Sequence, residues 1–166
     1  GRGFFVDAVD DVLATATVKP MVNQVYYHAG FLGTEYANKK YMDEQGIVLQ
    51  AFSPLGAGTT GKPRTPALIT GEVVSAIGDK YGKSSAQVAI CWLASRGLVV
   101  IPKSVTPARV LQNREVKFEL SAEDIAKVDA LNKDCRNGWG GPLSADGSPR
   151  DIAHPLYPFG AGRPAF

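Results

Sequence analysis

The chain has 166 residues, of which 45% are hydrophobic and 20% are charged, with a formal net charge of +2 at pH 7. This composition is that of an ordinary globular protein without the basic excess on which nucleic-acid binding depends. No apolar run approaches the roughly 20 residues of a membrane helix, and residues 1–5 do not resemble a secretory signal. We therefore expect one cytoplasmic domain, with neither nucleic acid nor membrane as a partner.

Three apolar segments predict β-strands, at residues 21–27, 47–53 and 98–101. Each segment is apolar along most of its length, which favours a parallel sheet buried on both faces. Because helical patterns separate the three segments, the sequence predicts an α/β fold.

Helical patterns lie between the strands and after them. Thr34 can cap a helix that Gly46 ends directly before the second strand. Ser84 and Gln87 can form a capping box for a helix that Gly97 ends before the third strand. Apolar side chains at helical spacing mark three helices: Val73, Val74, Ile77 and Tyr81; Ala89, Trp92 and Leu93; and, after a cap at Ser121, Ile125, Val128 and Leu131.

Two stretches rich in Gly and Pro, residues 56–66 and 135–166, are expected to be loops. The first follows the second strand and so lies at the carboxyl end of the sheet, where ligands bind in parallel α/β folds. Cys91 and Cys135 lack the spacing of a disulfide framework or a metal site. We expect two free thiols and no bound metal.

A cation, a hydroxyl and a helix start directly follow the third strand. Thr106 is a suitable N-cap, and Pro107 at the first helical position loses no hydrogen bond. The free amides of this helix start carry the positive end of the helix dipole, and Lys103, Ser104 and Arg109 add donors around them. We predict a phosphate site here, against the alternative of a solvated helix start with ordinary capping.

The segment from the third strand into this helix closely resembles the cofactor-binding signature of the aldo-keto reductases. The resemblance implies that Lys103 and Arg109 bind the 2′-phosphate of NADP and that Ser104 assists them. It further implies that Gln112 and Asn113 reach the adenine.

A second segment, residues 52–57, resembles the loop after strand seven in the same family. In that loop an aromatic ring stacks on the nicotinamide, and the following residues wrap the pyrophosphate. The resemblance implies that Phe52 supplies the ring, while Ser53, Leu55 and Ala57 supply the loop. Ala57 lacks the hydroxyl that is usual at its position.

A third segment, residues 23–25, resembles an Asn-Gln-Val strand whose glutamine holds the nicotinamide carboxamide, which implies this role for Gln24. The next residues depart from the family, because Tyr26 stands in place of a glutamate. Strand alternation puts Gln24, Tyr26 and His28 on one face. Tyr26 and His28 are the candidate catalytic residues of this chain, as an acid and a base.

The resemblance covers nearly all of the chain but corresponds only to the second half of a family member, whose fold is a (β/α)8 barrel. It implies a partial, half TIM-type barrel with parallel strands, outer helices and a long C-terminal tail. Residues 1–134 would form the incomplete, cofactor-binding barrel, and residues 135–166 would pack over the pocket. The Tyr, Lys, Asp and His that reduce the carbonyl in relatives lie upstream of the matching part.

The resemblance implies an NADP-dependent oxidoreductase that transfers hydride to a small-molecule carbonyl once another chain supplies the missing catalytic residues. An open barrel edge would expose unpaired backbone groups, so we expect a homodimer or a complementing chain to cover it. Two alternatives stay open. One is a non-redox enzyme that uses Tyr26 and His28, and the other is a catalytically inactive nucleotide-binding or regulatory protein.

Overall fold

The computed structural model describes residues 6–30, 35–56 and 70–132. In chain order the elements are α1 (Val6–Thr15), β1 (Val22–Tyr26), α2 (Glu35–Glu44), β2 (Val48–Phe52), α3 (Glu72–Tyr81), α4 (Ser85–Ser95), β3 (Val99–Ile101), α5 (Pro107–Arg114) and α6 (Ala122–Asp129). The predicted α/β class is confirmed, since all three predicted strands are present and helices separate them. The predicted tail at residues 135–166 and nearly all of the predicted loop at residues 56–66 lie outside the described residues.

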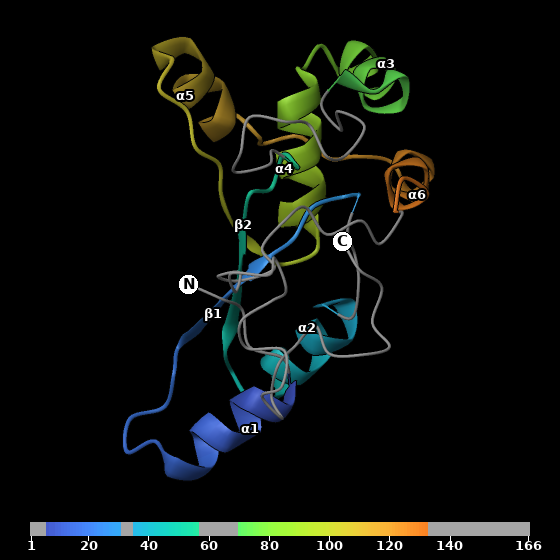
Figure 1. The fold of residues 1–166 in the computed structure, drawn as a ribbon. Coiled ribbons are helices and arrows are strands. Elements are labelled where there is room, and N and C mark those ends of the chain that lie inside the picture. Colours follow the sequence, from blue (N-terminus) through green and yellow to red (C-terminus); the bar gives the residue numbers. More distant parts are fainter. Residues whose placement is uncertain (1–5, 31–34, 57–69, 133–166) are drawn as a thin grey trace, which may run out of the picture.

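The three strands form one parallel sheet in the order β1-β2-β3. Gln24 pairs with Gln50, and Tyr26 pairs with Phe52. Phe52 pairs in turn with Ile101 of β3. Because all the strands run in the same direction, their carboxyl ends meet at one edge of the sheet (Figure 1).

One face of this sheet is buried, and the other is partly open. The buried face carries Asn23, Val25, Leu49 and Ala51. The expectation that both faces are buried is wrong for the described part of the chain, because side chains on the opposite face remain 39–49% exposed: Val22, Val48, Val99 and Ile101. The alternation of buried and exposed residues is that of a sheet covered on one side.

Helix α4 supplies the centre of the core. Trp92 is fully buried, and its ring stacks on Tyr27 with ring centroids 6.3 Å apart. Its indole N–H donates to Asp129 Oδ1 of α6 at 2.8 Å, while the Arg96 guanidinium lies 4.4 Å from the ring centroid and also contacts Asp129. In Figure 1, α3, α4 and α6 group at one end of the view, and α1 and α2 group at the other.

The predicted helix ends that lie within the described residues are largely confirmed, whereas Thr34 lies outside them. Gly97 follows α4 with a positive φ of 75°, a conformation that glycine adopts without a Cβ clash. The capping box is present, with Ser84 Oγ accepting from Gln87 N at 3.3 Å and Gln87 Oε1 accepting from Ser84 N at 3.0 Å. Val73 is a correction, because it is 37% exposed, whereas Val74 directly after it is buried. Successive side chains of a helix point about 100° apart around its axis, so Val73 points away from the core that Val74 faces.

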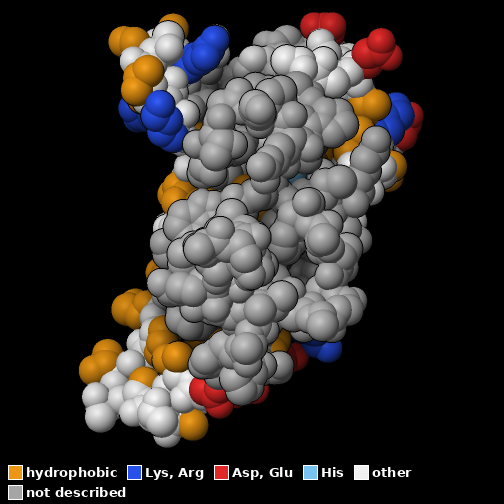
Figure 2. Space-filling view, viewed as in Figure 1, with side chains coloured by type: hydrophobic (Ala, Val, Ile, Leu, Met, Phe, Trp, Pro, Cys, Tyr) orange, Lys and Arg blue, Asp and Glu red, His pale blue; other side chains and the backbone are white. Residues whose placement is uncertain are grey.

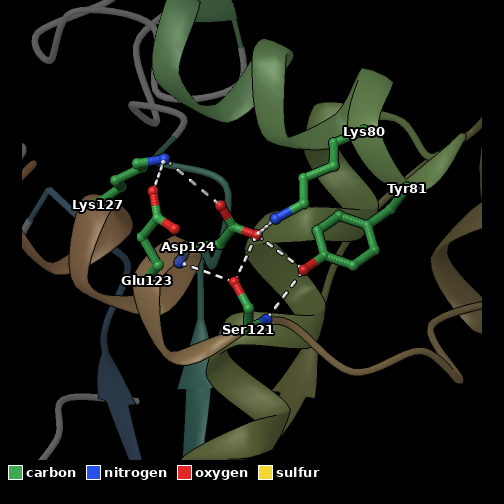
Figure 3. A network of polar contacts seen from close by, with 6 residues as sticks. All are labelled: Lys80, Tyr81, Ser121, Glu123, Asp124 and Lys127. Carbon is green, nitrogen blue, oxygen red and sulfur yellow. Dashed lines mark hydrogen bonds and ion pairs between the residues drawn. The ribbon is translucent and has the colours of Figure 1, made fainter.

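A buried carboxylate joins α6 to the end of α3 (Figure 3). The Asp124 side chain is 2% exposed, and its Oδ2 accepts from Lys80 Nζ at 2.6 Å, from Tyr81 Oη at 2.7 Å and from Ser121 Oγ at 2.8 Å. Ser121 also caps α6, as predicted, by accepting from Asp124 N. These hydrogen bonds, the one from Lys80 above all, hold the pKa of Asp124 well below its ordinary value.

We expect the chain to lose stability as the pH falls below about 4. Because the pKa of Asp124 is lowered in the folded chain, its contribution is complete above the unfolded-state pKa and declines as the pH falls toward the folded value. Urea unfolding at about pH 6 and about pH 3 measures this decline. The side chain at position 124 cannot titrate in Asp124→Asn, so the free energy of unfolding of this variant should fall less between the two pH values. A fall as large as that of the unaltered chain would show that Asp124 is not the cause.

Candidate functional site

Two rows of side chains lie across the carboxyl half of the sheet, on the face opposite the buried one. In the first row Gln24 Nε2 donates to Gln50 Oε1 at 2.6 Å. In the second row the rings of Tyr26 and Phe52 have centroids 5.4 Å apart. The sequence analysis missed Gln50, and the available signal was a second glutamine, at the middle of an apolar strand.

His28 follows β1 and is fully buried. Its Nε2 lies 2.9 Å from Tyr26 Oη, and its Nδ1 accepts a hydrogen bond from Gly30 N at 3.1 Å. Burial lowers the pKa of His28 to about 4, so the imidazole is neutral at neutral pH. The structure thus brings together the two side chains that the sequence nominated as a pair.

β2 ends in a tight turn. Gly56 N donates to Ser53 O at 3.0 Å, and Ser53 has a positive φ of 50°, which is uncommon for a residue other than glycine. Leu55 is half-buried and packs against the core. Ala57 lies outside the described residues.

The segment after β3 holds the predicted basic pair. Lys103 and Arg109 are both exposed, and neither forms an ion pair with an acidic residue in the described ranges. Ser104 is half-buried, and its Oγ accepts from Thr106 N at 3.1 Å. Thr106 is the N-cap residue, as predicted, although its side chain makes no capping hydrogen bond. Pro107 does lie at the helix start, as predicted.

Helix α5 extends this basic segment on an open surface, since none of its residues is buried. Gln112 is exposed and Asn113 is half-buried. In Figure 2, Lys and Arg side chains lie beside hydrophobic ones at the corner where Figure 1 places α5, whose own cations are Arg109 and Arg114. The N-terminal amides of α5 thus lie near side chains that can bind an anion.

Other parts of the described chain offer less for chemistry. A surface cavity of about 660 Å³ lies between α2, α4 and α6, and it is lined by Lys39, Lys40, Asp43, Glu44, Ser95, Arg96 and Ile125. Its carboxylates are paired with lysines of the same helix. In the described ranges no group of His, Cys, Asp or Glu could hold a metal ion. None of the helices there has the length and apolar character needed to cross a bilayer.

The chain is an α/β protein with a parallel sheet. In such folds the usual place of a ligand site is the carboxyl ends of the strands, where the candidate side chains lie. Residues 2–133 match the family model described as the Aldo/keto reductase family. The chain therefore belongs to this family. It is 41% identical to aldo-keto reductase family 1 member A1 of Sus scrofa, over 91% of this chain and 47% of that protein. The chain spans about half the length of the curated relatives it matches.

Solved structures give the same result. The chain matches MGS-M4, an aldo-keto reductase enzyme from a Medee basin deep-sea metagenome library, with a TM-score of 0.69 and 33% identity over 80% of this chain and 47% of that chain. It matches aldo-keto reductase AKR2E5, known from the silkworm Bombyx mori and here complexed with NADPH, with a TM-score of 0.70 and 29% identity over 82% of this chain and 42% of that chain. The predicted partial barrel of the aldo-keto reductase kind is confirmed.

Proposed function

We propose that this chain binds NADP(H) along the carboxyl edge of its sheet, as the cofactor-binding part of a cytoplasmic, NADP-dependent carbonyl reductase. One observation carries the proposal: strand pairing in register puts Phe52 beside Ile101, just before the segment that carries Lys103, and places Gln24 two residues before Tyr26, the residue that pairs with Phe52. Family membership supports the reductase class. The match to a relative complexed with NADPH supports the cofactor.

The described side chains fit the parts of the dinucleotide. Gln24 offers an amide for the carboxamide, and the half-buried ring of Phe52 offers a face for the nicotinamide. Lys103 and Arg109 are exposed cations next to the N-terminus of α5, where a phosphate is stabilised. When bound, NADPH would supply the hydride for carbonyl reduction.

Reduction also needs a proton donor beside the substrate carbonyl. We assign that donor to barrel residues outside this chain, because the chain spans about half the length of its curated relatives. We propose that a homodimer or a complementing chain completes the barrel over the partly open sheet face, where Val22, Val48 and Val99 are 44–49% exposed.

Calorimetric titration of the full chain with NADPH tests the proposal, with sedimentation to measure the mass of the same sample. We expect a dissociation constant in the range of about 1–100 μM, and heats no larger than dilution at that concentration would refute it. A small aldehyde should be reduced negligibly by the chain alone and measurably after a first-half aldo-keto reductase chain is added.

The same assay separates the two alternatives. Turnover that needs no nucleotide and that Tyr26→Phe abolishes would favour a non-redox enzyme. NADPH binding without aldehyde reduction, even in the presence of the complementing chain, would favour a regulatory protein.

A further inference from the structure

Gln50 lies in the middle of β2 on the partly open face of the sheet, and the proposed function gives it no role. It pairs in register with Gln24 of β1 and with Val99 of β3. Gln50 is half-buried, and its neighbours on the same face of β2 are Val48 and Phe52. An amide in such an apolar setting is unfavourable unless its polar atoms find hydrogen-bond partners.

The pairing of the two glutamines uses only part of their hydrogen-bonding capacity. Gln24 Nε2 donates to Gln50 Oε1 at 2.6 Å. Each primary amide has two N–H donors and an oxygen that can accept twice. Among the residues that the structure describes, neither side chain has a further polar partner. Gln24 Oε1 therefore remains as an acceptor, and Gln50 Nε2 remains as a donor.

A primary carboxamide is complementary to this pair. It offers a carbonyl oxygen to the N–H of one glutamine and an N–H to the oxygen of the other. If both glutamines turn their amides over together, the hydrogen bond between them is kept and their two roles are exchanged. A carboxamide that turns with them makes the same two contacts, so the complementarity belongs to the pair in either arrangement.

The glutamine pair lies close to the proposed contact with the nicotinamide ring. Phe52 follows Gln50 by two residues on the same face of β2, which is about 7 Å along a strand. Gln24 lies beside Gln50 at the same level of the sheet. A nicotinamide that lies against the Phe52 ring can therefore direct its carboxamide toward both glutamines.

We propose that Gln50 is a specificity-determining residue of the cofactor site, which acts with Gln24 to select a ring that carries a primary carboxamide. Each glutamine makes one hydrogen bond to the carboxamide, one to its oxygen and the other to its N–H. The inference rests on the proposed function, in which Gln24 alone was assigned to the carboxamide, and it adds a second contact.

Calorimetric titration of the full chain with three probes tests the inference. NADP+ carries the carboxamide, 3-acetylpyridine-NADP+ keeps the carbonyl oxygen but has a methyl group in place of the amide nitrogen, and 2′-phospho-ADP-ribose lacks the ring altogether. The methyl group leaves one glutamine without its partner. We therefore expect the unaltered chain to bind NADP+ about five- to tenfold more tightly than the acetyl analogue.

Gln50→Leu removes the second amide and releases Gln24 from its hydrogen bond. Gln24 can then turn either end of its amide toward the ligand, so NADP+ and the acetyl analogue each keep one contact. We expect NADP+ to bind about five- to tenfold more weakly, while the affinity for the analogue changes by less than about twofold. The preference for NADP+ should fall to about onefold, and the affinity for 2′-phospho-ADP-ribose should be unchanged.

Gln50→Glu is expected to keep the preference that Gln50→Leu loses. A carboxylate only accepts hydrogen bonds, so it holds Gln24 Nε2 toward itself and leaves Gln24 Oε1 for the ligand. Only NADP+ offers an N–H to this oxygen, so it should still bind at least about fivefold more tightly than the acetyl analogue. The added charge acts on both pyridinium rings alike and cancels in the ratio.

Gln45→Leu is the matched control, because it makes the same chemical change before the amino end of β2. Gln45 is half-buried, and its backbone carbonyl, rather than its side chain, accepts a hydrogen bond from Lys19. This variant should keep the full preference for NADP+ over the acetyl analogue.

The possible outcomes separate this inference from the proposed function. A preference that survives Gln50→Leu, that Gln45→Leu also abolishes, or that Gln50→Glu abolishes would overturn the inference and leave the proposed function intact. Equal affinities of the unaltered chain for all three probes would preserve the phosphate site and overturn the carboxamide contacts. Failure of the unaltered chain to bind any of the probes would overturn both proposals.

Discussion

Replacing Lys103 and Arg109 together by alanine is expected to weaken NADPH binding by about 100-fold, whereas NADH binding changes little. A hydrogen bond to a charged group contributes about 1.5–3 kcal/mol, or roughly 10- to 150-fold in affinity. Both side chains are exposed, so water competes with the phosphate and the lower end applies to each. NADH lacks the 2′-phosphate, so its affinity should not depend on the two basic side chains. Parallel titrations with the two nucleotides measure the difference.

Arg114→Ala is the matched control for a general effect of charge. Arg114 is also exposed and lies in the last turn of the same helix, at the opposite end from the free amides. Its removal should change NADPH affinity by less than about twofold. An equal loss for NADPH and NADH in the double variant, or a comparable loss in Arg114→Ala, would contradict a specific 2′-phosphate site.

Local signals in the sequence were sufficient for most of the fold. Ser84 and Gln87 predicted the start of α4, and Gly97 predicted its end, because capping depends on residues within one helical turn. The short α1 was not predicted, although Val6, Val9 and Leu13 repeat at helical spacing. Such a short pattern gains its stability from packing rather than from propensity.

The candidate site was predictable only in part. The roles of Gln24 and Phe52 could be assigned from the resemblance to the family, because each residue stands in a short segment that can be compared by itself. The pairing of Gln24 with Gln50 depends on the register between two strands, which the sequence of neither strand encodes. The hydrogen bond from Gly30 to His28 depends on the backbone after β1, so the histidine tautomer was beyond sequence reasoning.

Trp92→Ala is expected to destabilise the chain by about 3–5 kcal/mol, which is a large part of the roughly 5–15 kcal/mol that stabilises a typical domain. The ring is fully buried in α4 and stacks on Tyr27 directly after β1. Its removal leaves a cavity beside the sheet and deletes the hydrogen bond to Asp129 that joins α4 to α6. Urea unfolding followed by far-ultraviolet circular dichroism measures the loss without relying on the deleted fluorophore.

Two further variants serve as comparisons for Trp92→Ala, one at the same position and one on the outer side of α3. Trp92→Phe keeps an aromatic ring against Tyr27 but lacks the indole N–H, so it should be clearly less destabilising than Trp92→Ala. Val73→Ala, on the outer side of α3, should change the free energy of unfolding by less than about 0.5 kcal/mol. A loss at Val73 as large as the loss at Trp92 would mean that α3 buries that side chain, and the assignment of its core-facing side to Val74 and Ile77 would fail.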